Sequence, residues 1–455
     1  MLASAIREIK ALDPLCHEGR VTALEGLRIE VAGPAAALRL GAFVRFGDEN
    51  GPRGELVGFE GDRAILLASD PLDGLAPGAP VLFASGLDTV RPSDSWLGRV
   101  IDAFAEPLDG KGPLRPGMRP RPVRAIAPNA QIRARVYEKM GLGVKSIDVF
   151  APCARGQRLG VFAGSGVGKS TIMSMLARGA EADVIVIGLI GERGREVREF
   201  IEDTLGADGL AKSVIVTATS DEAAPKRRRA AWLTLAVAEH FRDEGKQVVC
   251  FLDSVTRFAM AQREIGLAAG EPPTTRGYTP SVFAELPKLL ERAGPGITVE
   301  EGQPQGHITG LFTVLVDGDD HNEPISDAVR GILDGHITLS RQIAERGRFP
   351  AVDVLKSISR LQQQLQAPQE REIARKARKL IALYSNMEEL VRIGAYAKGA
   401  DPEVDEAVRL WPQIEAFLQQ DVHDVTTTDD AFAKLLVVLA PPAPAQAVGP
   451  RKVGR

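Results

Sequence analysis

The sequence predicts an α/β fold with a β-rich segment before it and a helical segment after it. Five apolar runs alternate with helix-forming segments through the middle of the chain, and one of them leads into a Gly-rich loop followed by Lys and Ser. Such alternation is typical of a parallel sheet with helices on both faces, because each apolar strand is then buried on both sides. The 455 residues leave room for flanking domains at about 150 residues each.

The first part, residues 1–95, is expected to hold a terminal segment and a small β-domain. Short strand-forming runs are separated by breaks rich in Gly and Pro, and they lie at residues 28–31, 42–46, 63–67 and 80–84. Several short strands with this punctuation predict a small β-barrel or sandwich.

The middle part, residues 96–365, is expected to be the α/β domain. Its predicted strands are 158–163, 184–189, 213–217, 247–252 and 308–316, and its main predicted helices are 169–178, 193–204 and 229–243. After residue 366 the chain favours helices, notably 369–384 and 386–393, with no convincing strand up to residue 440. Residues 441–455 are rich in Pro and Gly and are expected to form a disordered tail.

Composition points to a cytoplasmic protein that does not bind nucleic acid. The net charge is −4, and the three cysteines, Cys16, Cys153 and Cys250, are too far apart to suggest a metal site or a disulfide framework. We find neither a signal peptide nor an apolar stretch long enough to span a membrane. The basic run 226–229 is expected to be a solvated helix start, because no aromatic stacking platform accompanies it.

The Gly-rich loop matches the phosphate-binding pattern G-x-x-x-x-G-K-[S/T], except that alanine occupies the first glycine position. In this pattern backbone N–H groups surround phosphate oxygens, Lys reaches the β- and γ-phosphates, and the hydroxyl binds Mg²⁺. Alanine is acceptable there only if its backbone dihedrals are ordinary. The expected nucleotide contacts are Ala163, Gly164, Ser165, Gly166, Val167, Gly168, Lys169, Ser170 and Thr171.

Three further residues are candidates for catalysis. Asp253 ends an apolar strand, as expected of a carboxylate near Mg²⁺, although a carboxylate in an ordinary turn would have the same pattern. Glu192 follows another strand and would lie at the carboxyl edge of the sheet, where such folds bind ligands. By sequence pattern alone, Glu192 could equally be solvated, and Arg360 could equally form a structural ion pair.

Longer motifs resemble the family of rotary ATP synthase catalytic subunits and their secretion relatives, most closely the flagellar protein export ATPases. The resemblance covers about residues 20–440. It is carried by the segments at 156–171 (GQRLGVFAGSGVGKST), 191–200 (GERGREVREF), 252–266 (LDSVTRFAMAQREIG), 271–294, 310–341 and 349–360 (FPAVDVLKSISR).

The resemblance implies roles for individual residues. Glu192 would polarise the attacking water with Arg193 beside it, and non-catalytic subunits of the family lack this glutamate. Asp253 would hold Mg²⁺ through water, and Arg257 would lie near the γ-phosphate of ATP. Phe349 would stack on adenine, where the synthase subunit has Tyr, and Arg360 would be an arginine finger offered to a neighbouring subunit.

The resemblance also implies an architecture and partners. It predicts an N-terminal β-barrel, a RecA-like core and a C-terminal helical domain, assembled as a ring of identical subunits, a hexamer. The expected partners are regulatory or stalk proteins, export-gate proteins and chaperone–cargo complexes, and only these partners would bring the chain to a membrane. The alternatives are the ATPase of a virulence-type secretion system, a rotary synthase subunit and a ring-shaped RNA translocase. The net charge of −4 argues against the RNA translocase.

Overall fold

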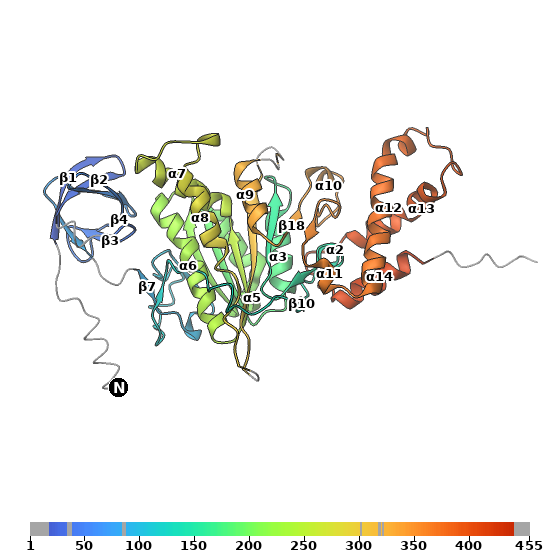
Figure 1. Ribbon diagram of the computed structural model, residues 1–455, viewed down its shortest axis with the longest axis horizontal. Coiled ribbons are helices and arrows are strands. Elements are labelled where there is room, and N and C mark those ends of the chain that lie inside the picture. Colours follow the sequence, from blue (N-terminus) through green and yellow to red (C-terminus); the bar gives the residue numbers. More distant parts are fainter. Residues whose placement is uncertain are drawn as a thin grey trace, which may run out of the picture.

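The computed structural model describes residues 18–33, 39–83, 88–300, 303–316, 320 and 323–440. Figure 1 shows three parts side by side: a barrel at one end, a helix-covered sheet in the middle and a group of helices at the other end. The predicted tail and Cys16 lie outside the described residues, whereas Cys153 and Cys250 are buried and unpaired by disulfide. Among the described helices, none combines the length and the apolar character needed to cross a membrane.

The N-terminal part is a closed barrel, which resolves the prediction of a barrel or a sandwich. Its six strands pair in the order β1-β2-β5-β4-β3-β6, and every observed pairing is antiparallel. The sequence prediction missed β1 and β4. The strands are β1 (Glu18–Glu25), β2 (Arg28–Ala32), β3 (Phe43–Phe46), β4 (Arg53–Glu60), β5 (Arg63–Ala68) and β6 (Pro80–Phe83).

The central part is built on a nine-stranded sheet, and all five strands predicted there are present. Eight of the strands run in the order β19-β18-β12-β17-β15-β13-β14-β8, and β16 pairs with β17 off this path. Only β16 and β19 are antiparallel to their neighbours. The strands are β8 (Arg99–Ile101), β12 (Arg158–Ala163), β13 (Val184–Glu192), β14 (Ser213–Thr219), β15 (Gln247–Asp253), β16 (Gly294–Pro295), β17 (His307–Leu315), β18 (Gly335–Thr338) and β19 (Ile358–Ser359).

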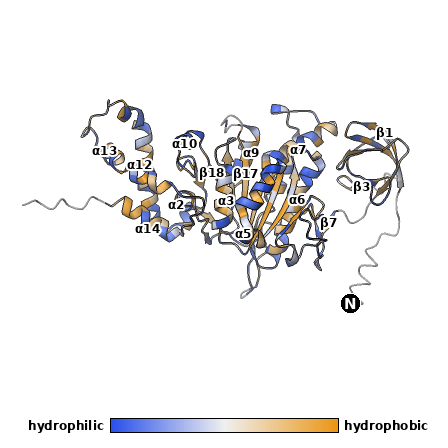
Figure 2. Ribbon diagram, turned by 180° about the vertical axis from the view of Figure 1, so that it is seen from behind, coloured by the Kyte–Doolittle hydropathy of each residue, from blue (hydrophilic) through white to orange (hydrophobic). Residues whose placement is uncertain are grey.

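Helices cover both faces of this sheet, as predicted. Alternate side chains of β13 enter different cores: Ile185 and Ile187 pack on the side of α3, and Val184 and Val186 pack on the side of α6. In Figure 2 the strands form an apolar layer between helices whose outer faces are polar. The main helices are α3 (Lys169–Gly179), α4 (Gly194–Glu199), α5 (Gly206–Ala211), α6 (Ala224–Asp243), α7 (Val255–Ala268), α8 (Pro280–Leu290), α9 (Pro324–Ile332) and α10 (Arg341–Glu345).

Two helix predictions need correction. The predicted helix 193–204 is α4 followed by a π-helical turn, η3 (Phe200–Leu205). The two predicted C-terminal helices are one continuous helix, α12 (Pro368–Arg392), which packs on α13 (Pro402–Leu418). Tyr384 of α12 stacks on Trp411 of α13 with ring centroids 4.3 Å apart, and α14 (Thr428–Val438) completes this part.

The basic run 226–229 begins a helix, but the prediction that it is solvated was wrong. Arg228 and Arg229 in α6 are buried. Arg228 forms an ion pair with the buried Glu55 of the barrel, and Arg229 lies over the Phe43 ring. Burial is tolerated because each guanidinium group has a charged, carbonyl or aromatic partner at the junction between barrel and core.

Candidate active site

The phosphate-binding loop connects β12 to α3 and has the backbone that the pattern requires. Gly166 and Gly168 have φ of 76° and 96°, which only glycine adopts readily. The non-glycine residues with positive φ in the described chain are Ala105 and Arg276, so Ala163 keeps an ordinary backbone and the departure from the motif costs no strain. Ser170 is exposed at the start of α3, where free N–H groups favour an anion.

Three predicted site residues meet beside this loop. Lys169 Nζ lies 3.0 Å from Glu192 Oε1 and 2.5 Å from Asp253 Oδ1. The three side chains come from the start of α3 and from the carboxyl ends of β13 and β15, which are paired in parallel. Parallel strands therefore bring both carboxylates to the edge of the sheet that carries the loop.

A fourth residue of this cluster, Thr313, was missed by the sequence analysis. Its hydroxyl donates a 2.6 Å hydrogen bond to Asp253 Oδ1. Thr313 lies on β17, the neighbour of β15 in the sheet, and it is fully buried. The only sequence signal was a polar residue inside an apolar run, and that pattern does not say which carboxylate the hydroxyl meets.

The charges of the cluster influence one another. Burial lowers the pKa of Lys169, but the neighbouring Asp253 and Glu192 carboxylates outweigh it, so its pKa is raised above the ordinary value. Burial raises the pKa of Asp253, Glu192 adds to the rise, and the hydrogen bonds from Lys169 and Thr313 oppose it. Lys169 is thus held as a cation between two carboxylates.

Arg257 lies next to the turn that carries Glu192. A Cβ added at Gly191 would come within 3.0 Å of the Arg257 side chain, so only glycine lets the two segments approach this closely. The Arg257 Nε atom is buried and has no hydrogen-bond partner within the described part of the chain. An unpaired guanidinium atom here has the chemistry to receive a phosphate oxygen.

Phe349 also lies beside the loop, next to Gly168. Its ring is 3.6 Å from the position that a Cβ would take on Gly168, and the side chain is 44% exposed. The backbone carbonyl of Phe349 accepts a 3.0 Å hydrogen bond from the N–H of Gln420 in the C-terminal part. An exposed ring held beside the loop is suited to stacking on a base.

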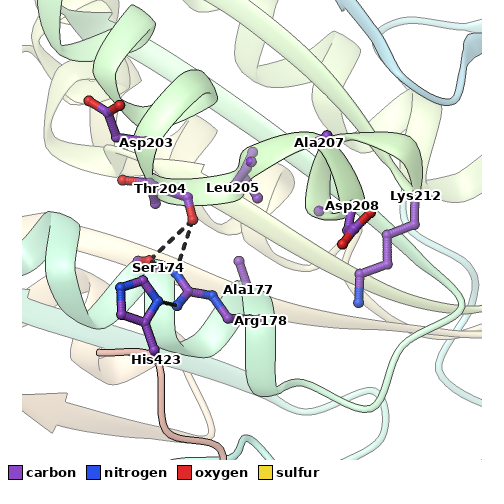
Figure 3. A pocket seen from close by; sticks show the side chains of 12 residues that line it. Ser174, Ala177, Arg178, Asp203, Thr204, Leu205, Ala207, Asp208, Lys212 and His423 are labelled. Atoms are coloured by element: carbon purple, nitrogen blue, oxygen red, sulfur yellow. Dashed lines mark hydrogen bonds between the residues drawn. The ribbon is translucent and has the colours of Figure 1, made fainter. Parts of the chain in front are cut away.

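Arg178 joins α3 to two other elements, as Figure 3 shows. Its guanidinium group donates to Ser174 Oγ on α3, to the Thr204 carbonyl of η3, to the Val422 carbonyl and to His423 Nδ1. Arg178 and three of these partners, Ser174, Thr204 and His423, border a cavity of about 580 Å³. The helix that begins with Lys169 is therefore tied to the segment after Glu192 and to the C-terminal part.

Two predicted site residues are not brought into the cluster. Arg193 is exposed, and its recorded side-chain contact is with Glu196 at 3.8 Å. Arg360 follows β19, and its N–H bonds the Asp334 carbonyl, while the Asp334 N–H bonds the Arg158 carbonyl. Arg360 is therefore level with the start of β12, and the loop begins about 16 Å away at the strand's other end.

Comparison with known proteins agrees with this geometry. Residues 143–359 match the model of the ATP synthase alpha/beta family nucleotide-binding domain, and residues 366–436 match the type III secretion EscN ATPase C-terminal domain. The chain is 58% identical to the flagellum-specific ATP synthase of Caulobacter vibrioides, over 96% of this chain and 99% of that protein.

Solved structures give the same result. The assembled ATPase EscN of the enteropathogenic E. coli type III secretion system matches with a TM-score of 0.86 and 40% identity, over 93% of this chain and all of that chain. EscN in complex with its central stalk EscO matches with a TM-score of 0.84, 40% identity and the same coverage. The chain is thus an ATPase of the ATP synthase alpha/beta family and belongs to the branch of flagellum-specific and type III secretion ATPases.

Proposed function

We propose that this chain is the cytoplasmic ATPase that energises the export of flagellar proteins through a type III secretion apparatus. The meeting of Lys169, Glu192 and Asp253 beside the phosphate loop carries the catalytic half of this proposal. The 58% identity to a flagellum-specific relative, against 40% to EscN, supports flagellar rather than virulence-type export.

Each residue of the cluster has a separate task in hydrolysis. Lys169 exchanges its two carboxylate partners for the β- and γ-phosphates of ATP, which releases Glu192 to orient and polarise the attacking water. Arg257 supplies positive charge near the γ-phosphate, and Arg193 flanks Glu192 from the start of α4. Phe349 stacks on adenine, while the loop from Ala163 to Thr171 holds the phosphates.

Ser170 and Asp253 would hold Mg²⁺. A hydroxyl and a carboxylate are the oxygen donors that Mg²⁺ prefers, usually with waters and substrate phosphates completing the shell. The hydrogen bonds recorded for the Asp253 carboxylate from Lys169 and Thr313 both fall on Oδ1, so Oδ2 has capacity for a metal-bound water. The ion would neutralise charge on the phosphates.

Arg360 acts on the nucleotide of a neighbouring subunit. Its position at the far end of β12 puts its own phosphate loop out of reach, whereas a ring would bring this edge against the next copy's site. We therefore assign the working form as a homohexameric ring with sites at the subunit borders. A stalk protein, export-gate proteins and chaperone–cargo complexes are its partners, and EscN's complex with its stalk EscO supports the first of these.

Glu192→Gln tests the catalytic assignment directly. The amide keeps the size of the side chain but is a poor base, so ATP binding should persist while single-turnover cleavage is lost. Binding is measured with a fluorescent ATP analogue and cleavage by rapid quench. Cleavage that persists at the normal rate would make Glu192 structural.

The biological assignment is tested by deleting the gene. Loss of flagella supports the flagellar role, and intact flagella with loss of another secreted set would favour the virulence-type alternative. A purified chain that forms rings without a second subunit type would exclude the rotary synthase.

A further inference from the structure

Exposed apolar side chains gather at the amino-terminal edge of the central sheet, away from the phosphate loop. Four of them define what we call the edge patch: Ile132, Tyr137, Ile297 and Val299. Tyr137 is 74% exposed and Ile297 is 55% exposed. Ile297 and Val299 belong to the segment between β16 and β17, which projects from the lower end of the sheet in Figure 1.

The backbone under the edge patch is firmly held. The Thr298 N–H donates to the Ile132 carbonyl at 2.8 Å, and the Ala134 N–H donates to the Gly296 carbonyl at 3.0 Å. The Arg133 guanidinium group donates to three carbonyls, those of Glu291, Ala293 and Pro295. The apolar side chains are thus presented on a rigid support, which lowers the entropy cost of binding a partner.

The edge patch adjoins a groove rather than a flat surface. Tyr137 and Val299 line a groove of about 770 Å³ that also includes polar side chains such as Gln131, Arg135 and Gln303. Apolar and aromatic groups with a polar rim are the usual composition of a protein interface. Grouped exposed apolar side chains of this kind mark interaction sites more often than singly scattered ones do.

A row of polar contacts connects the edge patch to Arg360. The Arg360 N–H bonds the Asp334 carbonyl, and the Asp334 carboxylate pairs with Arg158 at 3.0 Å. Arg158 also pairs with Glu291, whose carbonyl accepts from Arg133. Arg133 lies directly opposite Ile297, so the finger and the patch belong to one continuous edge.

We propose that the edge patch is the apolar anchor on which the next copy of this chain docks, through its nucleotide-binding edge, when the ring forms. The inference rests on the proposed function, because Arg360 serves a neighbour's site only if that neighbour covers this edge. A copy that reaches Arg360 also covers the residues continuous with it. The edge patch strengthens the subunit border, while Lys169, Glu192 and Asp253 perform the chemistry.

Tyr137→Ser and Ile297→Ser test the edge patch, with Ile393→Ser as the matched control. Ile393 is 70% exposed after α12, in the C-terminal part. Ring formation is followed by mass photometry and sedimentation over a concentration series with Mg²⁺ and a non-hydrolysable ATP analogue. Each edge-patch variant should need at least about tenfold more protein to assemble, since truncating one of the few anchor residues that carry most of the binding energy costs more than about tenfold in affinity.

The other measurements distinguish assembly from catalysis. Edge-patch variants should bind a fluorescent ATP analogue as the wild type does and should regain specific ATPase activity at high concentration. Assembly of both edge-patch variants at the wild-type concentration would overturn the inference and leave the proposed function standing. A wild-type chain that hydrolyses ATP as a monomer at every concentration would overturn both the trans role of Arg360 and the edge patch.

A second experiment does not depend on how the serine variants fold. Tyr137 is replaced by the photoreactive benzoylphenylalanine in the purified full chain, which is then irradiated in the presence of the ATP analogue. Crosslinks between two copies, mapped by mass spectrometry to the loop-bearing edge of the second copy, support the inference. Crosslinks confined to one copy, or to another face of the second copy, would refute it.

Discussion

Thr313→Val should reduce ATP hydrolysis more than any other conservative change on β17. Valine keeps the shape of threonine but removes the hydroxyl that donates to Asp253 Oδ1 at 2.6 Å. A hydrogen bond to a charged group contributes about 1.5–3 kcal/mol, which corresponds to about 10- to 100-fold in rate if it is used fully in the transition state. Because Lys169 also holds this oxygen, we expect a loss near the lower end, about tenfold in kcat.

The same substitution predicts a change in pH dependence. Burial raises the pKa of Asp253, and the Thr313 hydrogen bond opposes that rise by favouring the charged carboxylate. Without the hydroxyl the pKa of Asp253 rises further. The acid limb of the pH–activity profile should therefore shift to higher pH in Thr313→Val.

Thr309→Val is the matched control for Thr313→Val. Thr309 is a buried threonine on the same strand, and its hydroxyl accepts from the Gly156 N–H instead of bonding a site residue. Both variants should lose stability, but only Thr313→Val should lose kcat in a coupled phosphate-release assay. A kcat within twofold of wild type, or equal losses in the two variants, would refute the argument.

Three further outcomes are expected. Lys169→Ala should abolish steady-state phosphate release, because the loop loses the charge that holds the β- and γ-phosphates; substantial turnover would contradict the loop assignment. Arg360→Ala should lose about 10³-fold or more in rate. A mixture of Arg360→Ala and Lys169→Ala should nevertheless hydrolyse more ATP than the sum of the two variants alone. No recovery in the mixture would mean that Arg360 acts in cis or that the sites fire in strict sequence. Glu239→Gln should lower the free energy of unfolding by about 3–5 kcal/mol, because it leaves the buried Arg292 without its paired charge. An unchanged free energy of unfolding in urea would contradict this prediction.

The sequence was sufficient for elements with strong patterns. The apolar runs of β12, β13, β14, β15 and β17 were found because a strand buried on both faces must be apolar along its whole length. The same strands placed Asp253 and Glu192 at one edge of the sheet, since the carboxyl ends of parallel strands meet there, but the catalytic role of Glu192 was predicted only through the family resemblance. In the barrel, β4 was missed because its sequence, RGELVGFE, carries Gly and a buried Glu55 that only the distant Arg228 makes acceptable.

Contacts between distant segments were beyond sequence patterns. Nothing local indicates that Thr313 meets Asp253, or that Arg178 meets His423, because each pair is joined only by the tertiary fold. The prediction that the basic run 226–229 is solvated was wrong for the same reason. A charged run is normally solvated, and its burial here depends on partners in the barrel. The tasks of all the site residues stay predictions, and for Arg193 and Arg360 the single subunit shows only that neither joins the cluster.

The loop after α13 connects the C-terminal helices to the core through hydrogen bonds. Gln420 bonds the Phe349 carbonyl, and Val422 and His423 bond Arg178 on the helix that starts at Lys169. Losing these helices would remove one hydrogen-bond partner from the Phe349 backbone and two from Arg178. The C-terminal helices also share one apolar core with α3, so we expect them to unfold together with that part of the core. Helices exchanged with a relative should keep ATP affinity only if the donor loop matches Arg178 and Phe349.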